Sequence, residues 1–240
     1  MPGESKDTMT VEPTVIQRMQ SLAQQWEASA DSRAIFLNCY CVMTQNMIAA
    51  ADRREFDDPA WVNHLLRRFA DYYFIALDTY EQNPEAAPAV WRATHRAAAL
   101  PRVLPIQKLL MGVNAHINYD LVLALVDLLE PEWNRLGQER RASRYADHCR
   151  VNDIISQTID AVQDQVLQPA MPVMGVIDRL LGPLDERMIS RLIAGWRETV
   201  WQHAIRMIAL PAPDQRAALT QQIENATLRI GDLIQLRQAL

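Results

Sequence analysis

Glycine is scarce in this 240-residue sequence, which contains 7 of them, and no strand-hairpin signal is present. Also absent are the GxSxG elbow, the Walker loop, the dinucleotide-binding glycine fingerprint, the CxxC pair and the HExxH motif. Each of these patterns is tied to one kind of reaction or cofactor, so several familiar enzyme classes are excluded at the level of motif. A Ser–His–Asp triad stays open, because its members need not be near one another in the chain.

Cysteine and excess positive charge are also lacking. The three cysteines, Cys39, Cys41 and Cys149, fit a reducing compartment better than a disulfide framework. The formal net charge of −5 argues against a general nucleic-acid binder, which normally presents a basic face. The opening residues, MPGESKDTMT, lack the apolar core of a signal peptide. We therefore expect a cytoplasmic protein without a nucleic-acid partner.

The residues that are present favour helix almost everywhere, because alanine, leucine, arginine and glutamine dominate. We expect a disordered tail over residues 1–12 and a single all-α domain over residues 13–240. Proline and capping signals divide this domain into about eight or nine helices, packed as a bundle around a central one. The predicted helices cover residues 13–29, 32–51, 59–81, a shorter stretch after Pro88, 104–130, 139–168, 184–209 and a last stretch after Pro213.

The longest apolar run, LPIQKLLMGVNAHINYDLVLALVDLLEP at residues 104–131, predicts the central buried helix. Pro105 can start this helix, and Pro131 is expected to stop it. Polar residues interrupt the run in its middle, which weighs against a membrane span. The run is therefore interpreted as the core helix of the bundle.

Four polar residues at the centre of this helix predict a functional site: Asn114, His116, Asn118 and Asp120. At about 100° per residue, His116 and Asp120 share one face, while Asn114 and Asn118 share the neighbouring one. A buried neutral polar group without a partner costs roughly 1 to 3 kcal/mol, and a carboxylate costs more. We therefore expect His116 and Asp120 to be the residues that bind a metal or act as acid and base. We expect the two asparagines to orient them or the substrate.

The HxxxD spacing of His116 and Asp120 lets an imidazole and a carboxylate bind one metal from a single helix. A divalent zinc, iron or magnesium ion held there would activate water or an oxygen-bearing substrate. A metal needs three or four ligands, and we expect Asp147 and His148 to supply the others. Further candidate ligands are Asp71, Asp78, His95 and His203.

Two other interpretations of the same pair stay open. His116 and Asp120 can serve as an acid and a base without a metal. Alternatively the cluster is structural, with Asp120 accepting a hydrogen bond from His116 or an arginine while the asparagines bond across helices. The protein would then be a non-catalytic ligand-binding or interaction protein in which the cluster fixes helix register.

The segment NDIISQTID, residues 152–160, resembles the magnesium-binding NDxxSxxxE motif of class I terpene cyclases, with Asp160 in place of the glutamate. Asn152, Ser156 and Asp160 are four residues apart, so all three would face one magnesium ion. The aspartate-rich DDxxD partner motif of those enzymes is missing. A solvated polar stripe on an amphipathic helix gives the same pattern.

Several other side chains are candidates for contacting a substrate. We expect the face of the helix over 139–168 that carries His148 and Asn152 to point at the central helix, so that Asn152 completes the site. Arg197 and Trp201 would bind an anionic or planar group by ion pairing and stacking, or hold two helices together. Candidates for the wall of an apolar pocket are Tyr72, Trp91 and Tyr119.

From about residue 33 to 210 the chain resembles an uncharacterised family of bacterial helical proteins with a GxNAHINxDL signature, which here is GVNAHINYDL at residues 112–121. Looser similarities are the segments FADYYFIALDTY, RVND and RETVWQHA. The resemblance implies a shared helical architecture and a shared polar centre on His116, Asn118 and Asp120. It implies no known reaction.

These observations predict an enzyme with an enclosed helical pocket that acts on a small apolar substrate. His116 and Asp120 are its expected centre, either as metal ligands of a hydrolase or cyclase-like enzyme or as an acid–base pair. The alternatives are magnesium-dependent lyase chemistry at Asn152, Ser156 and Asp160, and a protein that binds without catalysis. The sequence leaves the oligomeric state open, a homodimer included.

Overall fold

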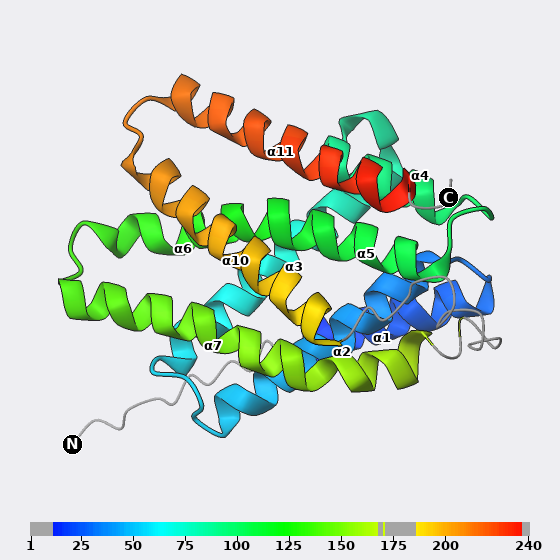
Figure 1. The fold of residues 1–240 in the computed structure, drawn as a ribbon, viewed down its shortest axis with the longest axis horizontal. Coiled ribbons are helices and arrows are strands. Elements are labelled where there is room, and N and C mark those ends of the chain that lie inside the picture. Colours follow the sequence, from blue (N-terminus) through cyan, green and yellow to red (C-terminus); the bar gives the residue numbers. More distant parts are fainter. Residues whose placement is uncertain (1–11, 168–169, 171–185, 237–240) are drawn as a thin grey trace, which may run out of the picture.

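The computed structural model describes residues 12–167, 170 and 186–236, and these fold into helices without a strand (Figure 1). In chain order the elements are α1 (Glu12–Ala28), α2 (Arg33–Asp52), α3 (Pro59–Gln82), the 3₁₀ turn η1 (Pro84–Ala86), α4 (Ala89–Ala98), α5 (Pro105–Ala115), the π-helical turn η2 (His116–Asp120), α6 (Leu121–Trp133), α7 (Gln138–Val162), the π-helical turn η3 (Gln163–Leu167), α10 (Glu186–Ala209) and α11 (Pro213–Leu236). The predicted all-α bundle of about eight or nine helices is confirmed by the nine α-helices of these ranges. The predicted tail falls outside the described residues, apart from Glu12, which already belongs to α1.

The predicted central helix is present as a continuous rod in which η2 joins α5 to α6 (Figure 1, green). Within η2 the amide of Leu121 donates to the carbonyl of His116, five residues earlier, so this turn holds one residue more than a regular helical turn. The helix was expected to stop at Pro131, but α6 continues through this residue to Trp133. Proline has no N–H, so it removes one hydrogen bond from the helix. Close to the end of a helix the loss is small enough for the last residues to stay helical.

The two halves of the rod have different neighbours. α5 packs against α2, α4 and α11, whereas α6 packs against α3 and α10. α7 packs mainly against α2 and α10, and His148 and Ile155 of its predicted inward face line a cavity that residues of the central rod also line. Helical spacing identifies the buried side of a helix, but it does not identify which helix covers that side.

The apolar core has two parts that meet along the rod. Leu65, Leu125 and Val200 belong to one cluster of buried side chains, which draws on α3, α6, α7 and α10. Leu37 and Leu109 belong to the other, which draws on α1, α2, α4 and α5. The candidate site described below lies where these clusters meet, since its lining comes from both.

Helix ends follow the predicted signals where a cap is present. The side chain of Asp58 accepts a hydrogen bond from the Trp61 amide at 3.0 Å, and Pro59 is the first residue of α3, as predicted. Glycine is absent from the ends of α1 and α2, where Ala30 and Arg54 take the left-handed conformation with φ of 55° and 59°. Both turns still close their helices with backbone hydrogen bonds that satisfy the last carbonyls.

One glycine is required by a close approach between helices. A Cβ atom on Gly112 of α5 would lie 2.4 Å from the ring of Phe36 in α2, which is closer than non-bonded carbon atoms come. Gly112 therefore lets α2 approach the central rod next to the polar turn. The first residue of the GVNAHINYDL segment thus has a packing role.

Two helices are long and apolar enough to cross a membrane by length and composition alone, namely α2 and the rod from Pro105 to Trp133. Both lie mostly inside the bundle, where they contribute its core. The expectation that the chain has no membrane-spanning segment stays a prediction.

Candidate functional site

His116 and Asp120 lie in contact inside η2, as their spacing predicted. His116 Nδ1 and Asp120 Oδ2 are 2.9 Å apart, and both side chains are buried. The indole Nε1 of Trp91 in α4 donates to both oxygens of Asp120, at 3.0 Å each. Trp91, proposed from the sequence as a pocket wall, is therefore the residue that holds the carboxyl group in place.

Aromatic rings surround the imidazole of His116. Phe69 in α3 stacks on it, with ring centroids 3.5 Å apart and planes 7° apart. Tyr40 in α2 meets it edge-on at 4.3 Å, and Phe36 and Tyr73 follow at 5.8 and 6.0 Å. Sequence reasoning did not assign these rings to the site, and the available signal was that each falls on the buried face of a helix predicted to be in the core.

Burial fixes the protonation of the pair. It lowers the pKa of His116 well below its usual value and raises the pKa of Asp120 well above its own, against a smaller lowering by the Trp91 hydrogen bond. The favoured state carries no net charge, with one proton shared between His116 Nδ1 and Asp120 Oδ2. In the tautomer in which Nδ1 accepts the Asp120 proton, Nε2 of His116 carries the imidazole hydrogen. This Nε2 is buried and has no hydrogen-bond partner among the described residues.

A cavity of about 180 Å³ lies beside the pair, and His116 forms part of its wall. Its lining comes from α2, α3, the central rod, α7, η3 and α10, and consists mainly of aliphatic and aromatic side chains such as Met43, Leu65, Val113 and Ile193. Because Nδ1 of His116 lies against Asp120, Nε2 is the ring nitrogen that has no partner among the described residues, and it is buried behind the cavity wall. Among the predicted site residues, the cavity is lined by His116, Asp147, His148 and Arg197.

The two asparagines point to a different side of the rod. Asn118 Nδ2 donates to Asn114 Oδ1 at 2.9 Å, and Asn114 Nδ2 donates to the Thr227 carbonyl of α11 at 2.9 Å. Neither residue lines the cavity. This geometry matches the interpretation in which the asparagines bond across helices, since they connect the central rod to α11.

His148 and Arg197, proposed separately from the sequence, bind each other. His148 Nε2 lies 3.0 Å from the Arg197 carbonyl, so it carries the hydrogen of that bond. Arg197 Nη2 donates to the His148 carbonyl at 2.7 Å and lies 3.3 Å from His148 Nδ1, while Nε donates to Asn152 Oδ1 at 2.8 Å. Burial and the Arg197 charge lower the pKa of His148 well below its usual value. These contacts join α7 to α10 at the cavity wall.

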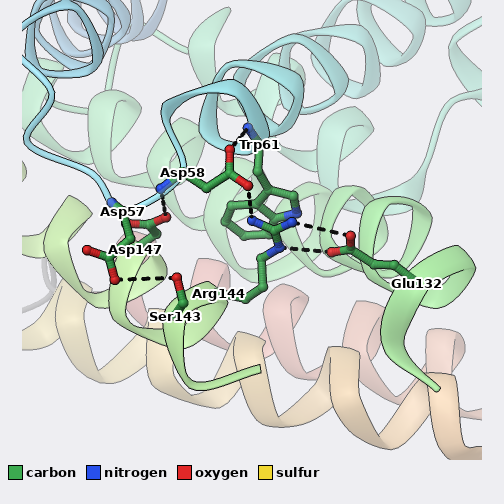
Figure 2. A network of polar contacts seen from close by, with 7 residues as sticks. All are labelled: Asp57, Asp58, Trp61, Glu132, Ser143, Arg144 and Asp147. Carbon is green, nitrogen blue, oxygen red and sulfur yellow. Dashed lines mark hydrogen bonds and ion pairs between the residues drawn. The ribbon is translucent and has the colours of Figure 1, made fainter. Parts of the chain in front are cut away.

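Asp147 holds the loop that leads into α3. Its carboxylate accepts from the amides of Asp57 and Asp58, at 2.6 and 2.9 Å (Figure 2). Next to it, Arg144 pairs with Asp58 at 2.6 Å and with Glu132 at 2.9 Å. The sequence did not single out Arg144, because partners 12 and 86 residues away leave no local pattern.

Of the four side chains proposed as metal ligands, only His116 and Asp120 bond to each other. His116 bonds to Asp120, whereas His148 bonds to Arg197 and Asp147 bonds to backbone amides. In the ranges that the structure describes, three or more His, Cys, Asp or Glu side chains do not gather in a metal-binding arrangement. Among the further candidates, Asp78 pairs with Arg18 on the surface and His95 stacks on Trp91.

The remaining predicted substrate contacts lie away from the cavity. Tyr72 donates to Asp127 at 2.8 Å on the surface between α3 and α6. Tyr119 is half-buried, and burial together with the charge of Glu224 raises its pKa to about 12. Trp201 packs beside the His148 ring with centroids 5.1 Å apart.

The residues of the terpene-cyclase-like segment are only partly described. Asn152 binds Arg197 and Ser156 is exposed. The Asp160 side chain lies outside what the structure describes. The magnesium site that this segment suggested stays a hypothesis.

Fold and site together define an all-helical bundle with a buried histidine–carboxyl pair at the edge of an apolar cavity. The chain matches, over residues 13–237, a family described as being of unknown function (DUF5995), and it belongs to that family. No curated protein and no solved structure matches the chain.

Proposed function

We propose that this protein is an enzyme that binds a small, largely apolar molecule in the cavity and protonates an oxygen atom of that molecule through His116. The observation that carries the proposal is the buried Nε2 of His116, which has no partner among the described residues and belongs to a residue that lines an apolar cavity. A buried donor without an acceptor costs roughly 1 to 3 kcal/mol, and a carbonyl or hydroxyl oxygen in the bound molecule would remove that cost.

The geometry supports a simple proton path. Nε2 gives its proton to the oxygen of the bound molecule, and the proton shared with Asp120 moves fully onto Nδ1. The imidazole is then neutral again and Asp120 is an anion, stabilised by the two hydrogen bonds from Trp91. Activation of a carbonyl and departure of a hydroxyl as water both begin with this step, so lyase or isomerase chemistry is the reaction class favoured.

Chemistry without a metal is the better-supported version of this proposal. The pair offers two donors, and a catalytic metal takes three protein ligands. Asp120 already bonds to Trp91 and His116. Metal-dependent chemistry would need a ligand beyond the described residues.

Binding is tested with an isosteric ligand pair. Titration of ¹⁵N-histidine-labelled protein with 2-octanone and with 2-methyl-1-octene compares a carbonyl with a methylene group of similar shape. We expect 2-octanone to bind about tenfold more tightly, because one hydrogen bond to a donor that otherwise has no acceptor contributes about this much to affinity. We also expect 2-octanone to shift the Nε2 resonance of His116. The variant His116→Phe should abolish the preference. Equal affinities with no shift in Nε2, or no binding of either compound, would overturn the proposal.

Catalysis is tested separately from binding. Eight-carbon ketones, secondary alcohols and alkenols are incubated with the protein, and the products are analysed by gas chromatography with mass detection. We expect conversion by the wild type and loss of conversion in His116→Phe and Asp120→Asn. Tight binding without conversion across the panel would reject the enzyme and leave a ligand-binding protein.

A further inference from the structure

The cavity has a second polar feature, the guanidinium group of Arg197. Only 4% of this residue is exposed, and it lies in the cavity wall. Its Nε and Nη2 atoms donate to Asn152 Oδ1 and to the backbone carbonyl and ring of His148. All of these acceptors are neutral. Within the described ranges, the structure contains no Asp or Glu within ion-pair distance of Arg197, and Nη1 makes no hydrogen bond.

Among the side chains that the structure describes, none compensates this positive charge, which lies in a largely apolar surrounding. Burial lowers the pKa of Arg197 to about 10, so the group stays charged at neutral pH. A buried charge without a counterion is costly, whereas a buried pair recovers much of that cost through attraction and hydrogen bonds. Arg144 offers the comparison within this chain, since it is similarly buried and is paired with both Asp58 and Glu132.

Asp147 lines the same cavity, but its carboxylate does not pair with Arg197. Its two oxygens accept from the amides of Asp57 and Asp58. His148 also adds no negative charge, because its Nε2 donates to the Arg197 carbonyl and its Nδ1 faces Nη2. These bonds fix the orientation of the guanidinium, so that Nη1 is positioned for a ligand before one arrives.

We propose that Arg197 binds the carboxylate of a small amphiphilic monocarboxylic acid whose apolar chain fills the cavity. This inference rests on the proposed function, and it narrows the substrate class to a medium-chain carboxylic acid with an oxygen acceptor along its chain for His116. A carboxylate matches the single charge of Arg197. A phosphate monoester carries close to two charges at neutral pH and would leave one uncompensated in an apolar wall.

The size of the cavity limits the length of the chain. An apolar cavity of about 150 Å³ accommodates benzene, so a cavity of about 180 Å³ accommodates a somewhat larger molecule. A chain of about eight carbons is the appropriate probe. Octanoate has this length and is ionised at neutral pH.

The test measures the dissociation constants of octanoate, 1-octanol and octyl phosphate by isothermal titration calorimetry at neutral pH. With the wild type we expect octanoate to bind at least about tenfold more tightly than 1-octanol, as a charge-assisted hydrogen bond provides, and more tightly than octyl phosphate. Equal affinities for octanoate and 1-octanol would overturn the inference, and tighter binding of octyl phosphate would overturn the carboxylate assignment.

Two substitutions assign the preference to Arg197. Arg197→Gln should remove it, and Arg197→Lys, which keeps the charge, should retain part of it. Arg144→Gln is the matched control, because it removes a buried arginine that does not line the cavity, and it should leave the preference unchanged. Loss of the preference in Arg144→Gln, or its persistence in Arg197→Gln, would contradict the inference. If Arg197→Gln does not fold, the wild-type comparison and Arg197→Lys decide the question.

The two proposals fail in different ways. If 2-octanone binds and shifts His116 Nε2 while octanoate shows no advantage over 1-octanol, the assignment of Arg197 alone is wrong. If neither 2-octanone nor any octyl compound binds, the proposed function is wrong as well.

Discussion

The indole Nε1 of Trp91 lies 3.0 Å from each carboxyl oxygen of Asp120, although the two residues are 29 positions apart in different helices. This pair of hydrogen bonds reduces the free-energy cost of burying the carboxyl group in the centre of the bundle. Trp91→Phe should therefore lower the free energy of unfolding by more than the loss of ring volume alone, by about a further 1 to 3 kcal/mol. Urea unfolding measures this loss.

A matched control for this prediction exists in Trp61. Trp61 is also buried, but its Nε1 has no hydrogen-bond partner among the described residues. Trp61→Phe removes a similar volume and an orphaned donor, so it should cost less than Trp91→Phe. Equal losses in the two variants would show that the bond to Asp120 contributes nothing to stability.

The stability of the protein should fall as the pH falls from about 6 to 5. Burial lowers the pKa of His95 to about 3 and lowers the pKa values of His116 and His148 well below 6.5, so below pH 6.5 the unfolded chain takes up three protons at these residues that the folded chain does not. Asp120 offsets one of them, since its raised pKa lets the folded state keep a proton that the unfolded state loses above pH 3.8. Three minus one leaves at most two protons, so the free energy of unfolding should fall by up to roughly 3 kcal/mol for each pH unit.

Unfolding by urea at several pH values measures this slope. His95→Gln should reduce the slope by up to one proton, roughly 1 kcal/mol per pH unit, and His95 does not line the cavity. A stability that rises toward pH 5, or a slope unchanged by the substitution, would contradict the assignment of buried neutral histidines.

Gly112→Ala should destabilise the fold through a clash between α5 and α2. The added methyl group would lie 2.4 Å from the Phe36 ring, and overpacking of this kind costs about 1 to 3 kcal/mol. The second substitution Phe36→Leu should recover part of the loss. Gly195→Ala is the control, because that glycine of α10 has no atom within 4 Å of the new methyl group and should gain stability from the helix propensity of alanine. Denaturation midpoints of the four proteins test this set.

Asn114→Ala should weaken the attachment of α11 without changing ligand affinity. The substitution leaves the Asn118 amide and the Thr227 carbonyl without this partner, which costs about 1 to 2 kcal/mol. Because Asn114 does not line the cavity, the affinity for 2-octanone should stay within about twofold. Lost affinity with unchanged stability would instead place Asn114 in the binding site.

The elements that the sequence predicts best are those set by local patterns. The apolar run predicts the central rod, and four-residue spacing predicts the contact of His116 with Asp120, since both follow from helix geometry. The sequence does not predict the contacts of Trp91 with Asp120, of Arg144 with Asp58, or of His148 with Arg197. These contacts join helices that are far apart in the chain, so they leave no period or motif. The packing of α7 against α2 and α10 likewise leaves no local pattern in the sequence.

The site follows the same division. The sequence indicates that polar side chains inside an apolar helix need hydrogen-bond partners. It does not indicate which of their polar atoms form hydrogen bonds in the folded protein. The structure separates the cluster into asparagines that connect helices and a histidine whose Nε2 has no partner in the part of the chain that is described.

The wide turn at η2 has a consequence for how the rod tolerates changes in length. A regular helix turns by about 100° per residue, so a deletion elsewhere in α5 or α6 would rotate every later side chain away from its neighbours. The extra residue of η2 is absorbed locally, so removing one residue there would give an ordinary helical turn and leave the phase of both halves intact. The same loss would displace His116 relative to Asp120. The bundle could thus survive a deletion that breaks the contact between His116 and Asp120, so the fold can outlast the activity proposed for this pair.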